Sequence, residues 1–479
     1  MESFYLQAAA AAGGTLLSVF VLIVAFRYLA GLFLSRWYTQ MVTDRYWENL
    51  FEIFHILKNI PTGGRLGVKP VSIEKNRPRR SFRRRKVKSP WENLLFNPVY
   101  LHRLPVLDYQ TIGTDVVIGP CSRRPLRLKI PILIGGMAYK TALNARAKQA
   151  LALGATMAGT AVNTGSGPFL PAERFAAEKL VIQYARGHLG KDLEVLRQAD
   201  AVEIQLGQGL WGPVPGEISP RRLARSPELQ ELLSVEKGEK AVIPPRLLGI
   251  KTPAELGELI ENLRRKTGGI PIGVKIGGTG RLEKELDLIL RAGPDFLAVD
   301  SLEGGNWGAA GDLGLPTLFT VTRARKFLEQ NNLRGKVTLL AGGGLATPMD
   351  FLKAMALGAD AVFIGTAALM ALVYTQAGRV LPWEIPTVMV FNQGYKGKNL
   401  NIAQGARGLE FFLKHAVQEM QETTLCLGKT HLNEVSPGDL SSINRELAVY
   451  LGIAWCGRQA FAGPAGFSGL KISNSSKED

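Results

Sequence analysis

Short apolar runs alternate with longer amphipathic runs eight times between Ile130 and Thr366. Strand–helix alternation repeated over about 240 residues predicts a parallel (β/α)8 barrel, the TIM barrel of the α/β class. A doubly wound open sheet is the alternative. The expected strands are IPILIG (130–135), ATMAGT (155–160), LVIQYA (180–185), AVEIQL (201–206), PIGVKI (271–276), FLAVDS (296–301), VTLLAG (337–342) and AVFIGT (361–366).

The segments between these runs have helical periodicity, as in TALNARAKQALAL, TPAELGELIENLRRK and PMDFLKAMALGA. The gap between Leu206 and Pro271, rich in proline and charge, predicts an insertion after the fourth strand. The chain has 479 residues, of which 46% are apolar and 21% charged. A chain of this kind can bury a large core, which excludes wholesale disorder.

The N-terminal segment is uncharged from Ser3 to Phe26. A helix of this length reaches ~36 Å, enough to cross a bilayer core of ~30 Å. Arg27 follows near the helix end, where it can snorkel, and Trp37 and Tyr38 resemble interfacial anchors. A signal peptide would carry positive charge before the apolar run, and a buried or interfacial helix is a further alternative. We expect residues 1–38 to form a transmembrane anchor.

The basic residues are concentrated after this segment. Nine of the fourteen residues from Lys75 to Lys88 are basic, against a net charge of +17 for the whole chain. Such a run indicates a solvated tether or contact with a membrane surface rather than with nucleic acid. Because positive charge marks the cytoplasmic side, we expect a single-pass protein of the cell membrane with a cytoplasmic catalytic domain. The expected organisation is a juxtamembrane basic linker (39–93), the barrel with a C-terminal extension (94–462) and a flexible tail (463–479).

The chain has three cysteines, at positions 121, 426 and 456. Their number excludes a disulfide scaffold and favours a reducing compartment. Their spacing matches no zinc or iron–sulfur ligand pattern, so no metal is expected. None of the histidines falls at the end of an expected strand, which argues against a catalytic histidine.

Glycines follow the last two expected strands, as Gly342-Gly343-Gly344 and as Gly365 before Thr366. In barrels of this class the functional residues lie at the carboxyl ends of the strands, and phosphate is commonly bound after strands seven and eight. Phosphate requires a close approach of backbone N–H groups, which glycine permits. Glycines also cap tight turns in any barrel, but the two clusters together favour a phosphate site.

Several strand-end segments resemble the flavin-binding synthase domain of glutamate synthase, in particular its stand-alone FMN-binding relatives. The resemblance covers roughly Leu94 to Arg458. It implies FMN at the barrel mouth and hydride transfer between the flavin and a carbon–nitrogen double bond, which in glutamate synthases belongs to the imine of 2-oxoglutarate and ammonia. The matching segments are IPILIGGMA, GTAVNTGSGPFLPAER, ADAVEIQLGQG, IGVKIGG, DSLEGGNWGAA, LLAGGGLATPMDFLKAMALGADAVFIGTAAL and FNQGYKGKNLNIAQGARGLEFFLKHAVQEM.

The resemblance also implies roles for individual residues. It implies that Lys275 lies near N1 and O2 of the flavin, where a cation stabilises the reduced ring. Lys275, Gln208 and Asp300 are the expected catalytic residues. The other expected cofactor-binding residues are Gly135, Gly136 and Met137 beside the ring, Asn163 and Thr164 after strand two, Gln205 with Gln208 near the pyrimidine end, Gly304 and Gly305 after strand six, and Gly343, Gly344, Gly365 and Thr366 at the phosphate.

Lys275 has other interpretations. It could form a structural ion pair with Asp300 or Glu203, since a lysine inside a barrel requires a charge partner. It could also be the Schiff-base nucleophile of a lyase or isomerase that acts on a phosphorylated metabolite. A third hypothesis is a barrel without chemistry that serves as a subunit of a membrane redox complex.

The sequence departs from complete glutamate synthases in several places. Glu2 stands where their glutaminase cysteine would follow the initiator methionine, and their closely spaced cluster cysteines are missing. Ser166 and Asn306-Trp307 alter the expected pocket lining. We therefore do not expect glutamine-dependent synthesis by this chain alone. The expected partners are a keto acid, imine or amino acid substrate and either an electron-donor protein or reduced nicotinamide.

Overall fold

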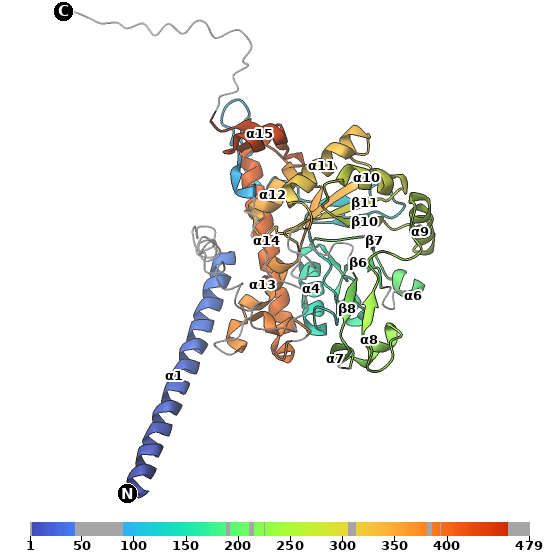
Figure 1. Ribbon diagram of the computed structural model, residues 1–479. Helices are drawn as coiled ribbons and strands as arrows, with labels where there is room; N and C mark the ends of the chain where they lie inside the picture. The colour runs from blue at the N-terminus through green and yellow to red at the C-terminus, as the bar shows by residue number, and fades with distance from the viewer. Residues whose placement is uncertain are drawn as a thin grey trace, which may run out of the picture.

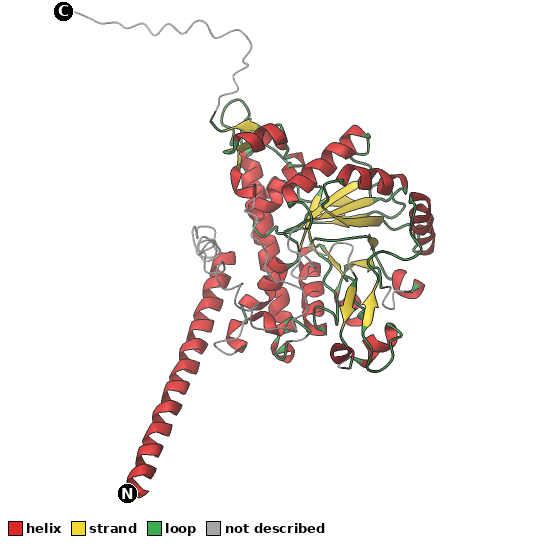
Figure 2. Cartoon of the chain, in the orientation of Figure 1, coloured by secondary structure: helices red, strands yellow, loops and turns green. Residues whose placement is uncertain are grey.

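Eight parallel strands close into a barrel in the computed structural model of the chain (Figures 1 and 2). Around the barrel the strands follow chain order, and the last strand pairs with the first. This confirms the (β/α)8 fold. The strands are β4 (Ile132–Ile134), β5 (Ala161–Asn163), β6 (Lys179–Tyr184), β7 (Ala201–Gln205), β10 (Ile272–Gly277), β11 (Phe296–Asp300), β12 (Thr338–Gly342) and β13 (Ala361–Ile364). The structure describes residues 2–43, 90–187, 192–209, 215–224, 226–304, 313–380, 386–392 and 394–457.

One expected strand is wrong. The segment ATMAGT at 155–160 lies mostly in helix α4 (Ala145–Ala158), which ends at Gly159 in the left-handed conformation with φ of 75°. The strand begins two residues later, at Ala161. Alanine has the highest helix propensity, so the alanine-rich run continues the helix until a glycine permits it to end.

The barrel interior is filled by side chains that alternate along the strands. Its lower part is an apolar cluster that includes Leu133, Phe296 and Leu340. The hairpin formed by β2 (Val116–Ile118) and β3 (Leu126–Leu128) contributes Ile118, Leu126 and Leu128 to this cluster and so closes the amino-terminal end of the barrel. Buried polar side chains of the barrel interior lie at the opposite, carboxyl end of the strands.

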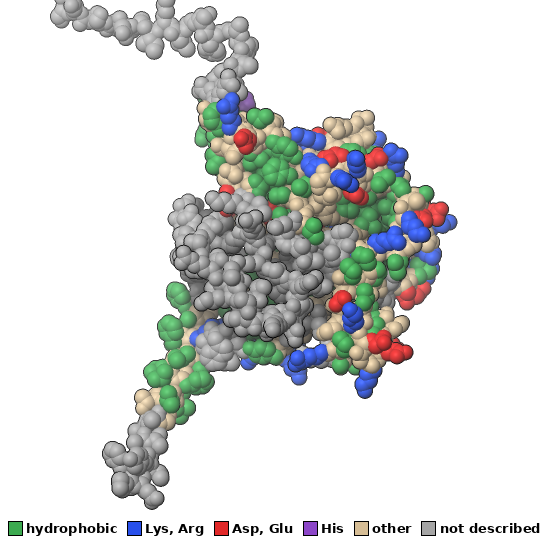
Figure 3. Space-filling view, in the orientation of Figure 1, with side chains coloured by type: hydrophobic (Ala, Val, Ile, Leu, Met, Phe, Trp, Pro, Cys, Tyr) green, Lys and Arg blue, Asp and Glu red, His purple; other side chains and the backbone are tan. Residues whose placement is uncertain are grey.

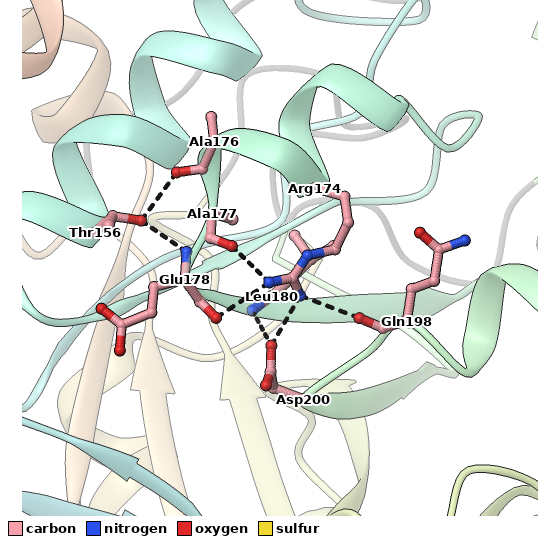
Figure 4. A network of polar contacts seen from close by, with 8 residues as sticks. All are labelled: Thr156, Arg174, Ala176, Ala177, Glu178, Leu180, Gln198 and Asp200. Carbon is pink, nitrogen blue, oxygen red and sulfur yellow. Dashed lines mark hydrogen bonds and ion pairs between the residues drawn. The ribbon is translucent and has the colours of Figure 1, made fainter.

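Arg174 connects the segments at the amino-terminal ends of β6 and β7 by hydrogen bonds and an ion pair (Figure 4). Its guanidinium donates to the carbonyl of Gln198 at 3.0 Å and pairs with Asp200 at 2.9 Å. The same carboxylate accepts from the Leu180 backbone N–H at 2.8 Å. These contacts lie at the end of the barrel opposite the expected site, so we interpret them as structural.

Helices and a small insertion surround the barrel. The two-stranded β8 (Gly216–Ile218) and β9 (Ala241–Ile243) lie in the predicted insertion after the fourth strand, with α7 (Pro220–Leu223) and α8 (Pro227–Leu232) between them. The remaining barrel helices are α5 (Pro171–Ala176), α6 (Leu193–Leu196), α9 (Pro253–Lys266), α10 (Leu282–Arg291), α11 (Thr317–Gln330), α12 (Pro348–Ala356) and α13 (Thr366–Tyr374).

The C-terminal part adds a long helix to one side of the barrel. Helix α14 (Ile402–Cys426) packs against α4, α12 and α13. Beyond it, β14 (Leu440–Ser442) lies between β1 (Leu94–Phe96) and β15 (Ala454–Trp455) in a three-stranded sheet. Helix α15 (Arg445–Leu451) connects β14 to β15. The extension is thus part of the same body as the barrel.

The N-terminal helix α1 (Glu2–Thr43) extends away from the domain (Figure 1). Its segment Gly13–Phe33 is long and apolar enough to cross a membrane. Its described side chains are mostly exposed and apolar (Figure 3), whereas Gly31 is buried. A Cβ on Gly31 would lie 3.0 Å from the Cα of Gly378, so the helix touches the domain near the end of the apolar segment. The basic run 75–88 and the tail 463–479 lie outside the described residues.

Candidate active site at the carboxyl end of the barrel

A layer of polar side chains lies above the apolar cluster, at the carboxyl ends of the strands. Residues two apart on a strand face the same side, so the side chains of this layer enter the barrel on the same face as the apolar cluster below. All of them are buried. We call these residues the polar layer: Asn163 on β5, Gln183 on β6, Glu203 on β7, Lys275 on β10 and Asp300 on β11.

Glu203 organises one half of the polar layer. Its Oε1 accepts from the Asn163 Nδ2 at 3.0 Å and from the Gln183 Nε2 at 2.7 Å. The oxygen of the Asn163 side-chain amide, Oδ1, accepts from the Gly165 backbone N–H at 2.9 Å. The carboxylate therefore fixes the orientation of the Asn163 amide and the start of the loop after β5. Gln183 was not singled out by sequence analysis, although a glutamine within the apolar run LVIQYA was a signal for it.

Lys275 and Asp300 form the other half. The Lys275 ammonium is 3.2 Å from Asp300 Oδ2 and 4.4 Å from the centre of the Phe363 ring, and the residue is 2% exposed. Burial by itself lowers the pKa of Lys275, but the carboxylates of Asp300 and Glu203 outweigh it and hold the pKa above the ordinary value. Lys275 is therefore a buried, protonated ammonium group. The ion pair that sequence analysis considered for this lysine is present.

Gln205 and Gln208 continue the strand that carries Glu203. Gln205 is the last residue of β7, pairs in register with Lys275 and is buried. Gln208 lies half-buried in the following loop. Gln205 lies next to the polar layer, and neither Gln205 nor Gln208 has a side-chain hydrogen bond to another described residue.

The loops after β4 and β5 meet around Gly136. A Cβ on Gly136 would lie 2.9 Å from Asn163 Oδ1 and 3.0 Å from the Gln183 amide nitrogen. Thr164 is fully buried, and its hydroxyl oxygen accepts from the Gln183 N–H at 3.1 Å. Gly135, Gly136, Asn163 and Thr164 thus lie together at the carboxyl end of the barrel, and Met137 continues the β4 loop.

A buried lysine that sequence analysis did not select holds these two loops. The Lys148 ammonium donates to the carbonyls of Met137 at 2.8 Å and of Asn163 and Thr164 at 3.2 Å each. It also pairs with Glu173 at 2.8 Å, and both side chains are almost completely buried. The sequence did contain an indication that Lys148 is buried, because position 148 shares a helix face with Leu151, Ala152 and Ala155, which are buried.

The expected phosphate glycines come from β12 and β13. Gly343 and Gly344 have φ of 109° and 73°, a region that disfavours other residues. Gly365 is the N-cap residue of helix α13 and has no side chain, so no N-cap side chain accepts from the first N–H groups of α13. A Cβ on Gly365 would meet only the Met137 sulfur, at 3.9 Å. This open helix N-terminus, with Thr366 as its first residue, suits a phosphate group.

The loop after β11 connects the polar layer with the glycines of β12. A Cβ on Gly304 would lie 2.2 Å from Asp300 Oδ1 and 3.1 Å from the Gly343 Cα, so only glycine fits there. The Ser301 hydroxyl is buried without a hydrogen-bond partner in the described part of the chain. Gly305, Asn306 and Trp307 lie outside the described residues. Ser166 lies half-buried in the loop after β5.

A small pocket opens between the two halves of the polar layer. Gly135, Gly136, Asn163, Lys275 and Phe363 form its upper lining, and the apolar cluster forms its floor. A phosphate at the start of α13 would accept hydrogen bonds from the uncapped N–H groups of that helix, and a flat polar ring above the pocket would lie beside the Lys275 ammonium. The residues present therefore fit FMN. Among the described residues, no group of three or more His, Cys, Asp or Glu side chains is placed to hold a metal ion.

Comparison with known proteins agrees with this geometry. A sequence profile described as "Conserved region in glutamate synthase" matches residues 100–429. A glutamate synthase large subunit-like protein of Rhizobium meliloti is 32% identical over 403 residues, which cover 79% of this chain and 90% of that protein. The chain belongs to the glutamate synthase family. It is accordingly an oxidoreductase, and FMN is the cofactor that family membership implies.

Other similar proteins are more distant or longer. An archaeal glutamate synthase [NADPH] of Archaeoglobus fulgidus is 30% identical over 307 residues, covering 62% of this chain and 59% of that protein. The chain thus spans less than two thirds of that relative's length. A solved flavocytochrome b2 mutant with benzoylformate is 17% identical, with a TM-score of 0.47 over 73% of this chain and 76% of that one. This likeness is too low to bear on the site.

Proposed function

We propose that the chain is a membrane-anchored FMN-dependent oxidoreductase that interconverts an amino acid and the corresponding imine. The observation that carries the proposal is the buried ammonium of Lys275 beside Asp300, in a polar layer at the mouth of the barrel. Lys275 lies across the pocket from Gly135 and Gly136. A flavin ring that bears negative charge after reduction is the ligand that such a buried cation favours.

Each part of the site has a separate task under this proposal. Gly343, Gly344 and the N-terminus of α13 at Gly365 and Thr366 hold the phosphate. Gly135, Gly136 and Met137 support one face of the ring, and the Gln205 amide offers donors and an acceptor to its pyrimidine edge. FMN, when bound, supplies hydride transfer at N5.

The chain's own residues prepare the substrate side. Lys275 stays protonated and supplies a fixed positive charge, so it acts electrostatically rather than as a base. Asp300 holds that ammonium in place and accepts from the Ser301 backbone N–H at 2.9 Å. Gln208 is half-buried in the loop after β7, and under this proposal its amide orients a substrate carboxylate or amino group.

2-Iminoglutarate and glutamate are the first substrate pair to test. The names of the relatives support glutamate chemistry, and the archaeal relative's name supports reduced nicotinamide as an electron donor. Because this sequence lacks the closely spaced cysteines that hold an iron–sulfur cluster in complete glutamate synthases, electrons would reach the barrel mouth from reduced nicotinamide or from a donor protein. Because Ser166 and Asn306-Trp307 alter the expected pocket lining, another keto acid is the alternative substrate.

The membrane part of the proposal rests on α1. Its segment Gly13–Phe33 has the length and composition of a span, and its apolar side chains are exposed. Burying exposed leucine, phenylalanine and valine side chains in lipid is favourable by roughly 1.5–3 kcal/mol each. Since the basic residues follow the span, the barrel would lie on the cytoplasmic side of the cell membrane.

Anaerobic reoxidation tests the reaction. Photoreduced holoenzyme mixed with 2-oxoglutarate and ammonium should reoxidise, and glutamine should not replace ammonium. Reoxidation by a different keto acid with ammonium would retain the reaction class and change the substrate. A flavin that stays reduced with every keto acid–ammonium pair would contradict amino acid–imine chemistry.

A further inference from the structure

A second hollow lies outside the barrel mouth, between the start of α4 and the start of α14. It has a volume of roughly 460 Å³ and is lined by Arg146, Arg379, Lys398, Asn399, Leu400 and Asn401. Three of these residues are cationic and none is acidic. Nothing in the amino acid–imine proposal uses this hollow.

The two arginines of this hollow donate hydrogen bonds to neutral oxygen atoms. The Arg146 Nε donates to the Leu400 carbonyl at 2.8 Å, and an Arg379 terminal nitrogen donates to the Gln404 side-chain oxygen at 3.3 Å. No carboxylate in the described part of the chain pairs with Arg146, Arg379 or Lys398. Each guanidinium therefore keeps further donors for a ligand.

Two long helices begin at the same place. Arg146 lies in the first turn of α4, and Asn401 is the N-cap of α14. The amino-terminal ends of helices carry partial positive charge, which adds to that of the side chains. The hollow is thus suited to an anion with several oxygen acceptors, such as a phosphate group.

The hollow is also next to the apolar helix. Arg379 belongs to the short helix η4 (Ala377–Arg379), which contacts α1. The neighbouring Gly378 lies against Gly31, two residues before the end of the apolar segment at Phe33. If that segment spans a bilayer, its carboxyl end lies at the level of the lipid headgroups. The η4 side of the hollow, with Arg379, then lies near that level.

We propose that this hollow binds the phosphate of an anionic phospholipid headgroup at the membrane surface. The inference rests on the membrane anchoring proposed above and is independent of the flavin chemistry. A bound headgroup would join η4, which contacts α1, to the starts of α4 and α14. Three cations near an anionic leaflet favour lipids with a negative headgroup, so specificity for charge should be measurable.

The test uses the full chain, purified with its flavin in a neutral detergent. Dihexanoyl phosphatidylglycerol should raise the midpoint of thermal unfolding in a saturable way, and dihexanoyl phosphatidylcholine should not. A triple variant, Arg146→Gln, Arg379→Gln and Lys398→Gln, should weaken the apparent affinity for the anionic lipid by about tenfold or more. Its flavin absorbance reports whether it is folded, and Lys398→Gln alone, at an exposed side chain, should give a smaller loss in the same direction.

A charge-matched control separates a site from general attraction. Arg265→Gln, Lys266→Gln and Lys284→Gln remove three exposed cations on α9 and α10, away from α1 (Figure 1). This control should keep the wild-type response. Equal losses in both triple variants, or an equal response to inorganic phosphate at the same concentrations, would overturn the proposal of a lipid site. Retained flavin and turnover in the first triple variant would show that the catalytic proposal stands separately.

Discussion

Lys148 and Glu173 form an ion pair of 2.8 Å whose side chains are 0% and 1% exposed, beneath the loops that carry Met137, Asn163 and Thr164. The same ammonium donates to the carbonyls of those three residues. A charge pair of this kind costs desolvation energy, which is recovered only through such additional hydrogen bonds. We interpret the pair as a positioning device for the flavin side of the barrel mouth.

Replacing Lys148 tests that interpretation. Lys148→Met leaves the Glu173 carboxylate buried without its cation, so the free energy of unfolding should fall by about 3–5 kcal/mol. The double variant Lys148→Met/Glu173→Met should recover much of that loss. Its FMN affinity should nevertheless remain reduced, because the three carbonyls have lost their common donor. Urea unfolding and FMN titration measure the two effects, and a double variant with wild-type FMN affinity would make the pair merely structural.

Removing the cation at the mouth should change the redox behaviour of the flavin. Lys275→Met/Asp300→Asn removes both members of the pair and so leaves no isolated buried charge. We expect a lower reduction potential and weaker FMN binding, because the positive charge that stabilises the reduced ring is gone. A spectroelectrochemical titration gives the potential. An unchanged potential in a folded variant would place Lys275 away from the ring.

The pH dependence follows from the raised pKa of Lys275. A group whose pKa is higher in the folded than in the unfolded state stabilises the fold below its unfolded pKa, and the contribution is lost as the pH rises through the folded pKa. For Lys275 this loss begins only above the ordinary lysine pKa of 10.5. Between pH 6 and 9 the wild type and Lys275→Met/Asp300→Asn should therefore have parallel stability profiles, measured by urea unfolding.

The same ammonium argues against Schiff-base chemistry, since a nucleophilic lysine needs a lowered pKa. Borohydride added to the enzyme with a keto acid should give no stable adduct on Lys275 by peptide mass spectrometry. An adduct at that residue would instead favour the lyase or isomerase hypothesis.

The substitution Gly365→Ala tests the phosphate site without disturbing the fold. Its φ is −116°, and a Cβ would meet only the Met137 sulfur at 3.9 Å, so Gly365→Ala should fold normally. The methyl group would point into the space at the start of α13 and should weaken FMN binding by tenfold or more, ~1.4 kcal/mol. Gly438→Ala, at an exposed and uncrowded position of η8 (Pro437–Asp439), is the control. Equal FMN affinity in both variants would move the phosphate elsewhere.

Deleting residues 1–37 tests the anchor. The barrel strands begin at Ile132, and among the described side chains of α1, residues 13–23 are exposed, so the shortened protein should be soluble and retain flavin. Fractionation of cells expressing each form measures the change. A shortened protein that fails to fold would mean that α1 belongs to the core, and a full-length protein found in the soluble fraction would contradict anchoring.

The sequence predicted the barrel because strands buried on both faces appear as continuous apolar runs with polar residues at their ends. That pattern located Lys275, Asp300, Gln205 and the glycines of the mouth. It misplaced strand two, because β5 has only three residues and follows an alanine-rich helix that resembles a strand by hydropathy.

The supporting contacts were harder to predict. Lys148 was missed because a lysine in a helix is normally solvated, and its burial depends on Glu173, a residue from another helix. The hollow lined by Arg146, Arg379 and Lys398 joins positions more than 200 residues apart, so no local pattern indicates it. Both features depend on tertiary packing, which a single sequence does not display.

The identity of the bound cofactor tests the central claim most directly. The purified full-length protein should be yellow, and heat should release FMN, identified by chromatography, at about one molecule per chain. Gly365→Ala should retain less of it than Gly438→Ala after the same purification. Release of FAD, or an absence of flavin that persists after reconstitution with FMN, would contradict the assignment of the barrel mouth.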